Sequence, residues 1–281
     1  MARRPLTDQE VFAYRQDGYI LVRRIFDSGE VDRLRRTAKE HRALDGHAFG
    51  RANGEGGKVR LSLWNRPGDT LYGMFARCKS MAASAEKLLG GEVYAYRSKT
   101  IVKDAMVGDA RTCRRDCDYW CQDGVLFPLL CSMFLAVGAA ARENGCMRVI
   151  RRSRKLGRID HVLAGDQPGA DTERVNEVLK RPGLVYVEMD PGDALFFDCN
   201  LLRGSGRNRS ENPRWSMTCC YNAGRKDPYK ESHHPRCAPL RKVPDSAIKQ
   251  AGLRRLADTT ADVAWLADDW DRSARTLGKK S

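Results

Sequence analysis

The sequence lacks any long uninterrupted run of apolar residues. Its most apolar window, Val125 to Ala141, contains Pro128 and Gly138, so it falls short of the roughly 18 apolar residues that a membrane span requires. The N-terminal stretch MARRPLTDQE passes directly into charged residues, without the apolar segment of about 7–15 residues found in secretory signals. We therefore expect a cytoplasmic protein that does not bind membranes.

Linkers, internal repeats and low-complexity tracts are also absent from the sequence. No Pro-, Gly- or Ser-rich stretch is long enough to separate two hydrophobic cores, and 281 residues suffice for one substantial core. These features predict a single domain spanning residues 1–281.

Cysteine, in contrast, is plentiful, with ten residues. A cytoplasmic location favours reduced thiols over disulfides. Cys113, Cys117 and Cys121 recur every four residues and would share one face of a helix, which is one way to build a metal cluster. Because the aromatic-rich stretch around them reads as extended or irregular, we favour small buried side chains over a metal site.

The charge is strongly positive, with a formal net value of +14. The basic residues are dispersed, the densest run being Arg151 to Lys155, and no aromatic-interleaved RNA motif or known DNA-binding module accompanies them. We expect no nucleic-acid partner. Binding of a nucleic acid or another polyanion is kept as a third hypothesis, which a steep salt dependence of binding would support.

The first ninety residues carry helix signals. Thr7 and Glu10 form an S/T-x-x-E capping box that predicts a helix start, and Ser28 is a plausible N-cap for a helix that continues to about Ala43. A further helix is predicted over residues 69–89, and a β-rich run between the first two helices begins after Asp17. The four glycines in residues 47–57 predict a loop.

Strand signals dominate the following part of the chain. Short β-branched and aromatic runs alternate with turn residues in "EVYAYRSKTIVKD", "GVLFPLLCSMFLAVG", "CMRVIRRS", "GLVYVEMDPGDALFFDCNLL" and "RWSMTCCYNAG". Helical spacing returns after Asp245, through "IKQAGLRRLADTTADVAWLADDW". This order predicts an α+β protein with a jelly-roll core between N-terminal and C-terminal helices.

Four segments carry a family resemblance in a fixed order: "YRQDGYILVRRIF", "ARENGCMRVIRRS", "GDALFFDCNLL" and "NRSENPRWSMTCCYNA". In these segments the chain resembles the phytanoyl-CoA dioxygenase family of Fe(II)- and 2-oxoglutarate-dependent oxygenases. The resemblance implies a double-stranded β-helix (jelly-roll, cupin-like) fold with a pocket inside the barrel.

The family's metal ligands are a His-x-Asp pair and a later histidine. In the alignment that the resemblance implies, the His-x-Asp position is Arg114-Arg115-Asp116, and Arg203 stands at the later histidine. A guanidinium has no lone pair to donate to a metal. The five histidines, His41, His47, His161, His233 and His234, do not match the missing positions, and we expect His161 to have a structural hydrogen-bonding role.

The positions implied for 2-oxoglutarate are better preserved. Arg214 matches the family's carboxylate-binding arginine, and Lys103 and Ser205 match positions that assist it. 2-Oxoglutarate or another carboxylate is therefore a candidate ligand. The alternative is that these residues only maintain a buried polar network.

The replacements predict a metal-independent site without Fe(II) or another obligatory cofactor. Asp116, Arg114 and Arg203 are the candidate catalytic residues, and the candidate pocket residues are Tyr119, Trp120, Gln122 and Phe134. We expect an anionic or carbonyl-bearing small molecule as the ligand. The protein would be a pseudoenzyme that acts as a partner subunit, beside an intact homologue or as a homodimer, or a non-oxidative catalyst of cyclisation or isomerisation, for instance in natural-product biosynthesis.

An active Fe(II)/2-oxoglutarate-dependent hydroxylase with unusual ligands is the alternative. In that case Asp116 would bind the metal together with Asp198 or a cysteine.

Overall fold

Two antiparallel β-sheets face one another and form the core of the computed structural model, which describes residues 3–40, 46, 48–52, 58–106, 111–164, 167–225, 228–232, 234–235, 238–254 and 265–266. Within these residues, the larger sheet has eight strands, seven of them in the order β1-β11-β6-β13-β4-β3-β14, with β2 also paired to β3. Its strands are β1 (Tyr19–Val22), β2 (Phe49–Ala52), β3 (Lys58–Trp64), β4 (Val93–Lys103), β6 (Leu130–Ala136), β11 (Ala194–Asp198), β13 (Arg214–Ala223) and β14 (Trp265–Leu266).

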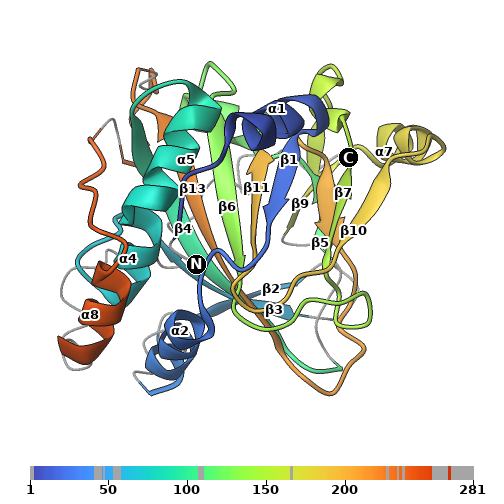
Figure 1. Cartoon of the computed structure of the whole chain (residues 1–281). Helices are drawn as coiled ribbons and strands as arrows, with labels where there is room; N and C mark the ends of the chain where they lie inside the picture. Colours follow the sequence, from blue (N-terminus) through green and yellow to red (C-terminus); the bar gives the residue numbers. More distant parts are fainter. Residues whose placement is uncertain are drawn as a thin grey trace.

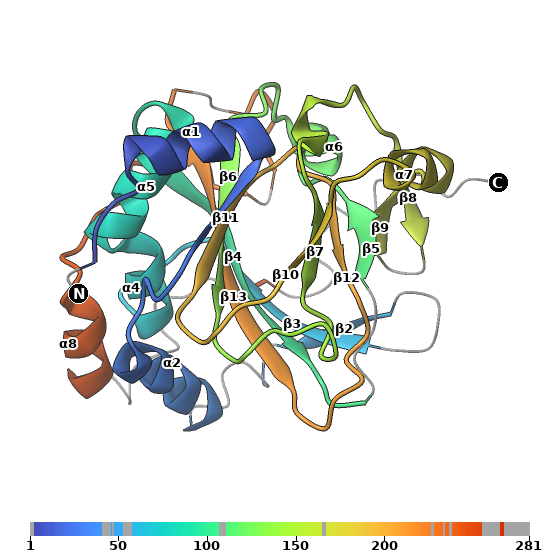
Figure 2. The same ribbon diagram turned by 45° about the vertical axis from the view of Figure 1, so that its right-hand side comes forward.

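The smaller sheet lies across the barrel from the larger one (Figure 2). Its four strands in the order β10-β7-β12-β5 are β5 (Arg111–Arg114), β7 (Met147–Ile150), β10 (Leu184–Val187) and β12 (Arg203–Ser205). A separate hairpin pairs β8 (His161–Ala164) with β9 (Gln167–Ala170). This arrangement confirms the predicted α+β jelly roll.

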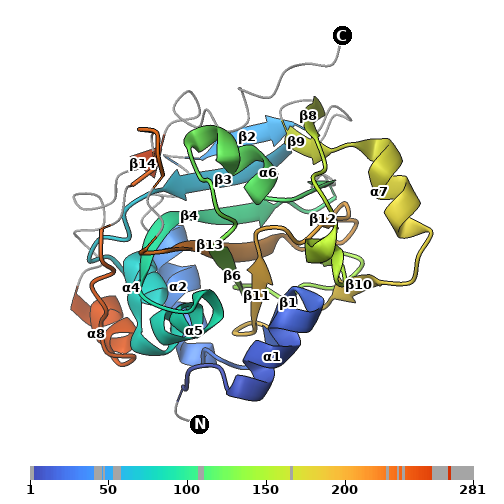
Figure 3. The same ribbon diagram turned by 90° about the horizontal axis from the view of Figure 1, so that it is seen from above.

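Helices cover the outer face of the larger sheet, as Figures 1 and 3 show. The helices on that face are α1 (Asp8–Asp17), α2 (Ser28–Glu40), α4 (Leu71–Arg77), α5 (Lys79–Leu89) and α8 (Ala247–Arg254). Away from it lie α6 (Cys117–Trp120), α7 (Thr172–Leu179) and the 3₁₀ turns η1 (Cys121–Asp123) and η2 (Ser153–Lys155). The capping box at α1 is formed, since Thr7 accepts from the Glu10 amide and the Glu10 side chain accepts from the Thr7 amide. Among the described residues, no helix is long and apolar enough to cross a membrane.

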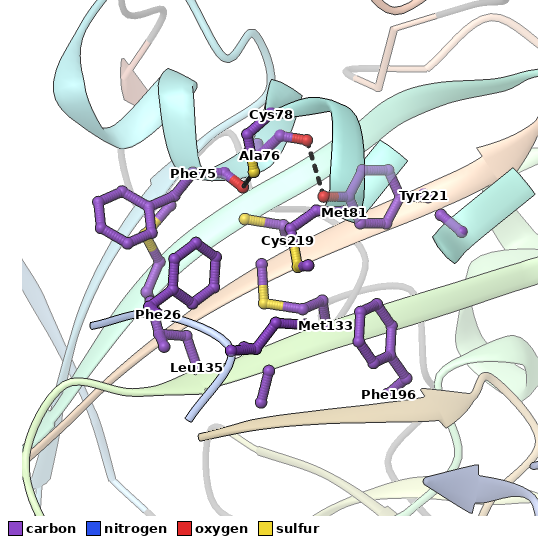
Figure 4. Close-up of a cluster of buried hydrophobic side chains, with 14 of the residues drawn as sticks. Phe26, Phe75, Ala76, Cys78, Met81, Met133, Leu135, Phe196, Cys219 and Tyr221 are labelled. Carbon is purple, nitrogen blue, oxygen red and sulfur yellow. Dashed lines mark hydrogen bonds between the residues drawn. The ribbon is translucent and has the colours of Figure 1, made fainter. Parts of the chain in front are cut away.

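Strand β6 of the larger sheet lies between two hydrophobic cores, one facing the helices and one between the sheets. All seven of its residues are buried, because Met133 and Leu135 pack toward the helices whereas Phe134 and Ala136 pack between the sheets. A strand covered on both faces is apolar throughout rather than alternating. Figure 4 shows the helix-facing core, where the Tyr221 hydroxyl donates to the Ala76 carbonyl at 2.7 Å.

Four predictions of local structure were wrong, in whole or in part. The glycine-rich loop contains strand β2, paired with β3, and the single helix over residues 69–89 is split at Cys78, which bridges to Val243. The stretch expected to be extended or irregular is extended at Cys113 in β5 but helical from Cys117 in α6. The C-terminal helix is described only for Ala247–Arg254, and β14 pairs with β3 where helix was predicted.

Candidate functional site

A small cationic cavity lies between the two sheets. Its volume is about 30 Å³, enough for one or two water molecules. The larger sheet contributes Lys99, Ile101, Phe134, Phe197, Arg214 and Thr218, and the smaller sheet contributes Arg114, Met147, Arg203, Gly204 and Ser205. Four of these side chains carry positive charge, and none of the described lining residues is acidic.

Strand pairing brings Arg114 and Arg203 together. The two residues are direct partners between β5 and β12, and both side chains are buried. The Arg203 guanidinium donates to Asp116 Oδ1, and its carbon lies 4.5 Å from the centre of the Phe197 ring. The three predicted catalytic residues, Arg114, Arg203 and Asp116, therefore lie together in the structure.

Asp116 lies at the base of this cluster, directly before α6. Its amide donates to the Cys199 carbonyl at 2.8 Å, and only 1% of the residue is exposed. Burial opposes ionisation, but the positive charges of Arg203, Lys99 and Arg114 outweigh it and hold the pKa of Asp116 below its ordinary value. Asp116 is therefore a carboxylate that acts as the counter-ion of the cluster.

His161 fixes the backbone beside this carboxylate. Its Nε2 accepts from the Arg115 amide at 2.9 Å, and its Nδ1 lies 2.9 Å from the Ile159 carbonyl. This pattern requires the neutral ring protonated on Nδ1, and burial lowers the pKa of His161 to about 4. The geometry matches the structural role predicted for this histidine.

The predicted carboxylate-binding residues adjoin the cluster. Arg214 pairs with Lys103 between β13 and β4 and donates to the Gly145 carbonyl. Lys103 donates to Ser205 Oγ at 2.9 Å and to the Gly206 carbonyl. Burial lowers the pKa of Arg214 to about 10, so the guanidinium stays charged at neutral pH. Arg214 and Ser205 thus reach the cavity, with Lys103 directly behind Ser205.

The other predicted pocket residues divide into two groups. Phe134 lines the cavity, whereas Trp120 packs against Tyr96 with ring centres 5.2 Å apart, in a separate apolar cluster. Gln122 lies on η1 and does not line the cavity. Trp120 and Gln122, which follow Asp116 on α6 and η1, are outside the lining of this cavity, and their role in a ligand pocket stays a prediction. The Tyr119 side chain lies outside the described residues.

Lys99 was missed by the sequence analysis. It stands four residues before Lys103 on β4, and residues two or four apart in a strand share a face. This alternation is the signal that could have identified it. Thr218, its direct partner on β13, was missed for the same reason.

The charged side chains next to Asp116 are Arg203, Lys99 and Arg114. Among the described residues, no group of three or more His, Cys, Asp or Glu side chains is arranged to hold a metal. Asp198, an alternative ligand, pairs with Arg154 at 3.1 Å and is not part of the cavity lining. A divalent ion about 4 Å from one guanidinium would be repelled by roughly 8 kcal/mol at an effective dielectric constant near 20.

The described cysteines take part in no group of side chains that could hold a metal. The nine cysteines in the described part of the chain are free thiols. Burial raises the pKa of the Cys220 thiol, and Ser132 Oγ donates to its sulfur at 3.2 Å. A thiol of this kind resists forming the thiolate that binds metals.

Solved structures share this double-stranded β-helix with its helical outer layer. The crystal structure of EctD from Sphingopyxis alaskensis in its apoform superimposes with a TM-score of 0.71, at 23% identity, covering 87% of this chain and 89% of that one. The α-ketoglutarate-dependent carbocyclase SnoK from nogalamycin biosynthesis gives a TM-score of 0.64 at 18% identity, covering 85% of this chain and 100% of that one.

The chain belongs to the phytanoyl-CoA dioxygenase (PhyH) family, whose profile matches residues 14–216. Among curated proteins, it is 27% identical over 235 residues to the ectoine dioxygenase of Sphingopyxis alaskensis, covering 78% of this chain and 76% of that protein. It is 25% identical over 170 residues to the L-proline trans-4-hydroxylase of Streptomyces griseoviridis, covering 55% of this chain and 63% of that protein.

Proposed function

We propose that this PhyH-family protein binds a small anionic or carbonyl-bearing molecule between its sheets without iron. The observation that carries the proposal is the pairing of Asp116 with Arg203, at the place where the family resemblance puts the metal. The Asp116 carboxylate already accepts a hydrogen bond from the Arg203 guanidinium. Neither Arg114 nor Arg203 can act as a metal ligand. The residues favour a bound anion where relatives would hold a cation.

The charge balance supports this assignment. Lys99, Arg114, Arg203 and Arg214 line the cavity, and the charges of the first three act on the Asp116 carboxylate. Buried charge is costly unless it is paired. A ligand carboxylate would neutralise part of the excess, and a planar guanidinium can bind such a group through two parallel hydrogen bonds.

The volume of the cavity limits the ligand. With about 30 Å³ of free space, the site as it stands accommodates a small anion, and a larger acid requires the arginine side chains to move. A cluster of fixed positive charges can polarise a bound carbonyl group. The site therefore suits a non-oxidative reaction such as an isomerisation or cyclisation, or the binding function of a partner subunit.

The relatives favour a second candidate, an active Fe(II)/2-oxoglutarate-dependent hydroxylase. Structures of EctD from S. alaskensis include one with bound Fe and one with 2-oxoglutarate and 5-hydroxyectoine. Arg214, Lys103 and Ser205 match the family positions for the co-substrate. This function would require the Asp116–Arg203 pair to separate and two further ligands to approach Asp116.

Metal analysis distinguishes the two functions. Protein purified without a metal-binding tag should contain no stoichiometric iron, and anaerobic titration with Fe(II) and 2-oxoglutarate should give no succinate when oxygen is admitted. Small carboxylates such as pyruvate should still raise the melting temperature, because a ligand that binds only the folded state stabilises it. Stoichiometric iron with succinate release would refute the metal-free assignment and establish the hydroxylase.

A further inference from the structure

Within the described part of the chain, Lys99 differs from the other cationic residues of the cavity in having no hydrogen-bond or ion-pair partner. Its side chain lies on the cavity side of β4, opposite Thr218 of β13. Lys103 on the same face is fully buried and donates to Ser205 and Gly206. Lys99 makes no hydrogen bond or ion pair with any described residue, so its amino group is available to react.

The surroundings of Lys99 favour the neutral amine. Burial lowers the pKa of Lys99 to about 7, with Arg114 and Arg97 acting in the same direction and Asp116 and Cys220 opposing them. Arg203 and Arg214 also face the cavity and add positive charge. A lysine in such surroundings has a large fraction of neutral amine at neutral pH, which is the form that attacks carbonyl groups.

The Thr218 hydroxyl is a second polar group that lines the cavity without a hydrogen-bond partner among the described residues. Thr218 is buried and lies on the strand adjacent to Lys99. A hydroxyl in this place can bond to the oxygen of an adduct formed at the Lys99 nitrogen.

We propose that Lys99 forms a Schiff base with the carbonyl carbon of a small 2-oxo acid whose carboxylate is held by the arginines of the cavity. The inference rests on the proposed anion-binding function and names its ligand class. The Lys99 ammonium group first releases one proton. The neutral nitrogen then bonds to the carbonyl carbon, the C–O bond breaks, and the oxygen leaves as water with that proton and a second one from the nitrogen. No oxidant or reductant takes part.

The Lys99 nitrogen carries the same positive charge in the ammonium form and in the product, so the charge of the cluster does not change. The ammonium and the iminium product each carry one positive charge, so Asp116 serves as the counter-ion before and after the reaction. An iminium withdraws electrons from the adjacent carbon, which provides a metal-free route to isomerisation or carbon–carbon bond formation.

Reductive trapping tests the proposal. The full chain is incubated with pyruvate and cyanoborohydride, and the product is examined by intact mass and peptide mapping. We expect a single adduct on Lys99, formed faster as the pH rises through neutrality. Lys99→Arg should lose the adduct while keeping the positive charge, and the exposed control Lys87→Met should retain it.

Lactate separates this proposal from the anion-binding function, because it has the carboxylate but no ketone. If pyruvate and lactate both raise the melting temperature but no adduct maps to Lys99, the Schiff-base proposal is wrong and anion binding stands. If neither acid stabilises the protein, the anion-binding function fails. Adducts spread evenly over exposed lysines would also overturn the assignment to Lys99. Peptide mapping of the protein without substitutions locates the adduct even if Lys99→Arg does not fold.

Discussion

Replacing Asp116 by asparagine tests the electrostatic reasoning on which the site depends. The substitution keeps the size of the side chain and removes its negative charge. Arg203 then loses the carboxylate to which it donates, and Arg114 and Lys99 lose the charge that offsets their own. All three remain between the sheets without that counter-ion.

The expected loss of stability is large. Both members of the Asp116–Arg203 pair are at least 96% buried at their side chains. Removing one partner of a buried ion pair costs about 3–5 kcal/mol, because the remaining charge is left uncompensated. This is a substantial part of the roughly 5–15 kcal/mol by which a folded domain is stable.

Urea denaturation at pH 7.5 measures this loss, with Asp17→Asn as the control. Asp17 pairs with Arg151 at 2.9 Å on the surface, where an ion pair contributes about 1 kcal/mol or less. Since the pKa of Asp116 is lowered on folding, its contribution is present above the ordinary carboxyl pKa and is lost as the pH falls below it. A loss no greater than that of Asp17→Asn would refute the claim that Asp116 holds the cluster together.

Three further predictions concern other parts of the chain. His161→Ala should lower the free energy of unfolding by about 1–3 kcal/mol, because a buried backbone N–H loses its acceptor. The pKa of His161 is lowered to about 4, so in urea titrations the difference in the free energy of unfolding between the two proteins should be full above pH 6.5 and shrink as the pH falls toward 4. A difference independent of pH would contradict the assignment of a neutral ring. The double variant Arg114→His with Arg203→His should bind Co(II), detected by its absorption bands, where the unmodified protein does not; a folded variant without metal uptake would show that the two positions are misplaced. Gly192→Ala should lower the melting temperature strongly, because Gly192 has φ +95° and an added Cβ would lie 2.2 Å from a backbone oxygen, whereas Gly157→Ala, with open space around it, should change it little; equal effects would contradict the strain argument.

Local signals in the sequence predicted much of the fold. The capping box at Thr7 specifies the start of α1 without help from the rest of the chain. Strand β3 was missed although its alternation of Val59, Leu61 and Leu63 with polar residues is a strand signal. The break at Cys78 depends on Val243, and a contact between residues so far apart leaves no local trace.

The site, unlike much of the fold, was predictable mainly from the family resemblance. The grouping of Arg114, Asp116 and Arg203 followed from the family resemblance, because composition and spacing alone do not pair β5 with β12. Lys99 was accessible from strand alternation with Lys103. The packing of Trp120 against Tyr96 was not predictable, because it depends on the short helix α6, which the surrounding aromatic residues do not indicate.

Strand β1 has a consequence for any shortened version of the protein. It pairs with β11 from Tyr19–Phe197 to Val22–Ala194, and among the described strands it has no neighbour on its other side in the larger sheet. A truncation that removed it would leave the backbone N–H and C=O groups of β11 open to strands of other molecules. Such a fragment would self-associate through the exposed edge even though none of the residues around the cavity had changed.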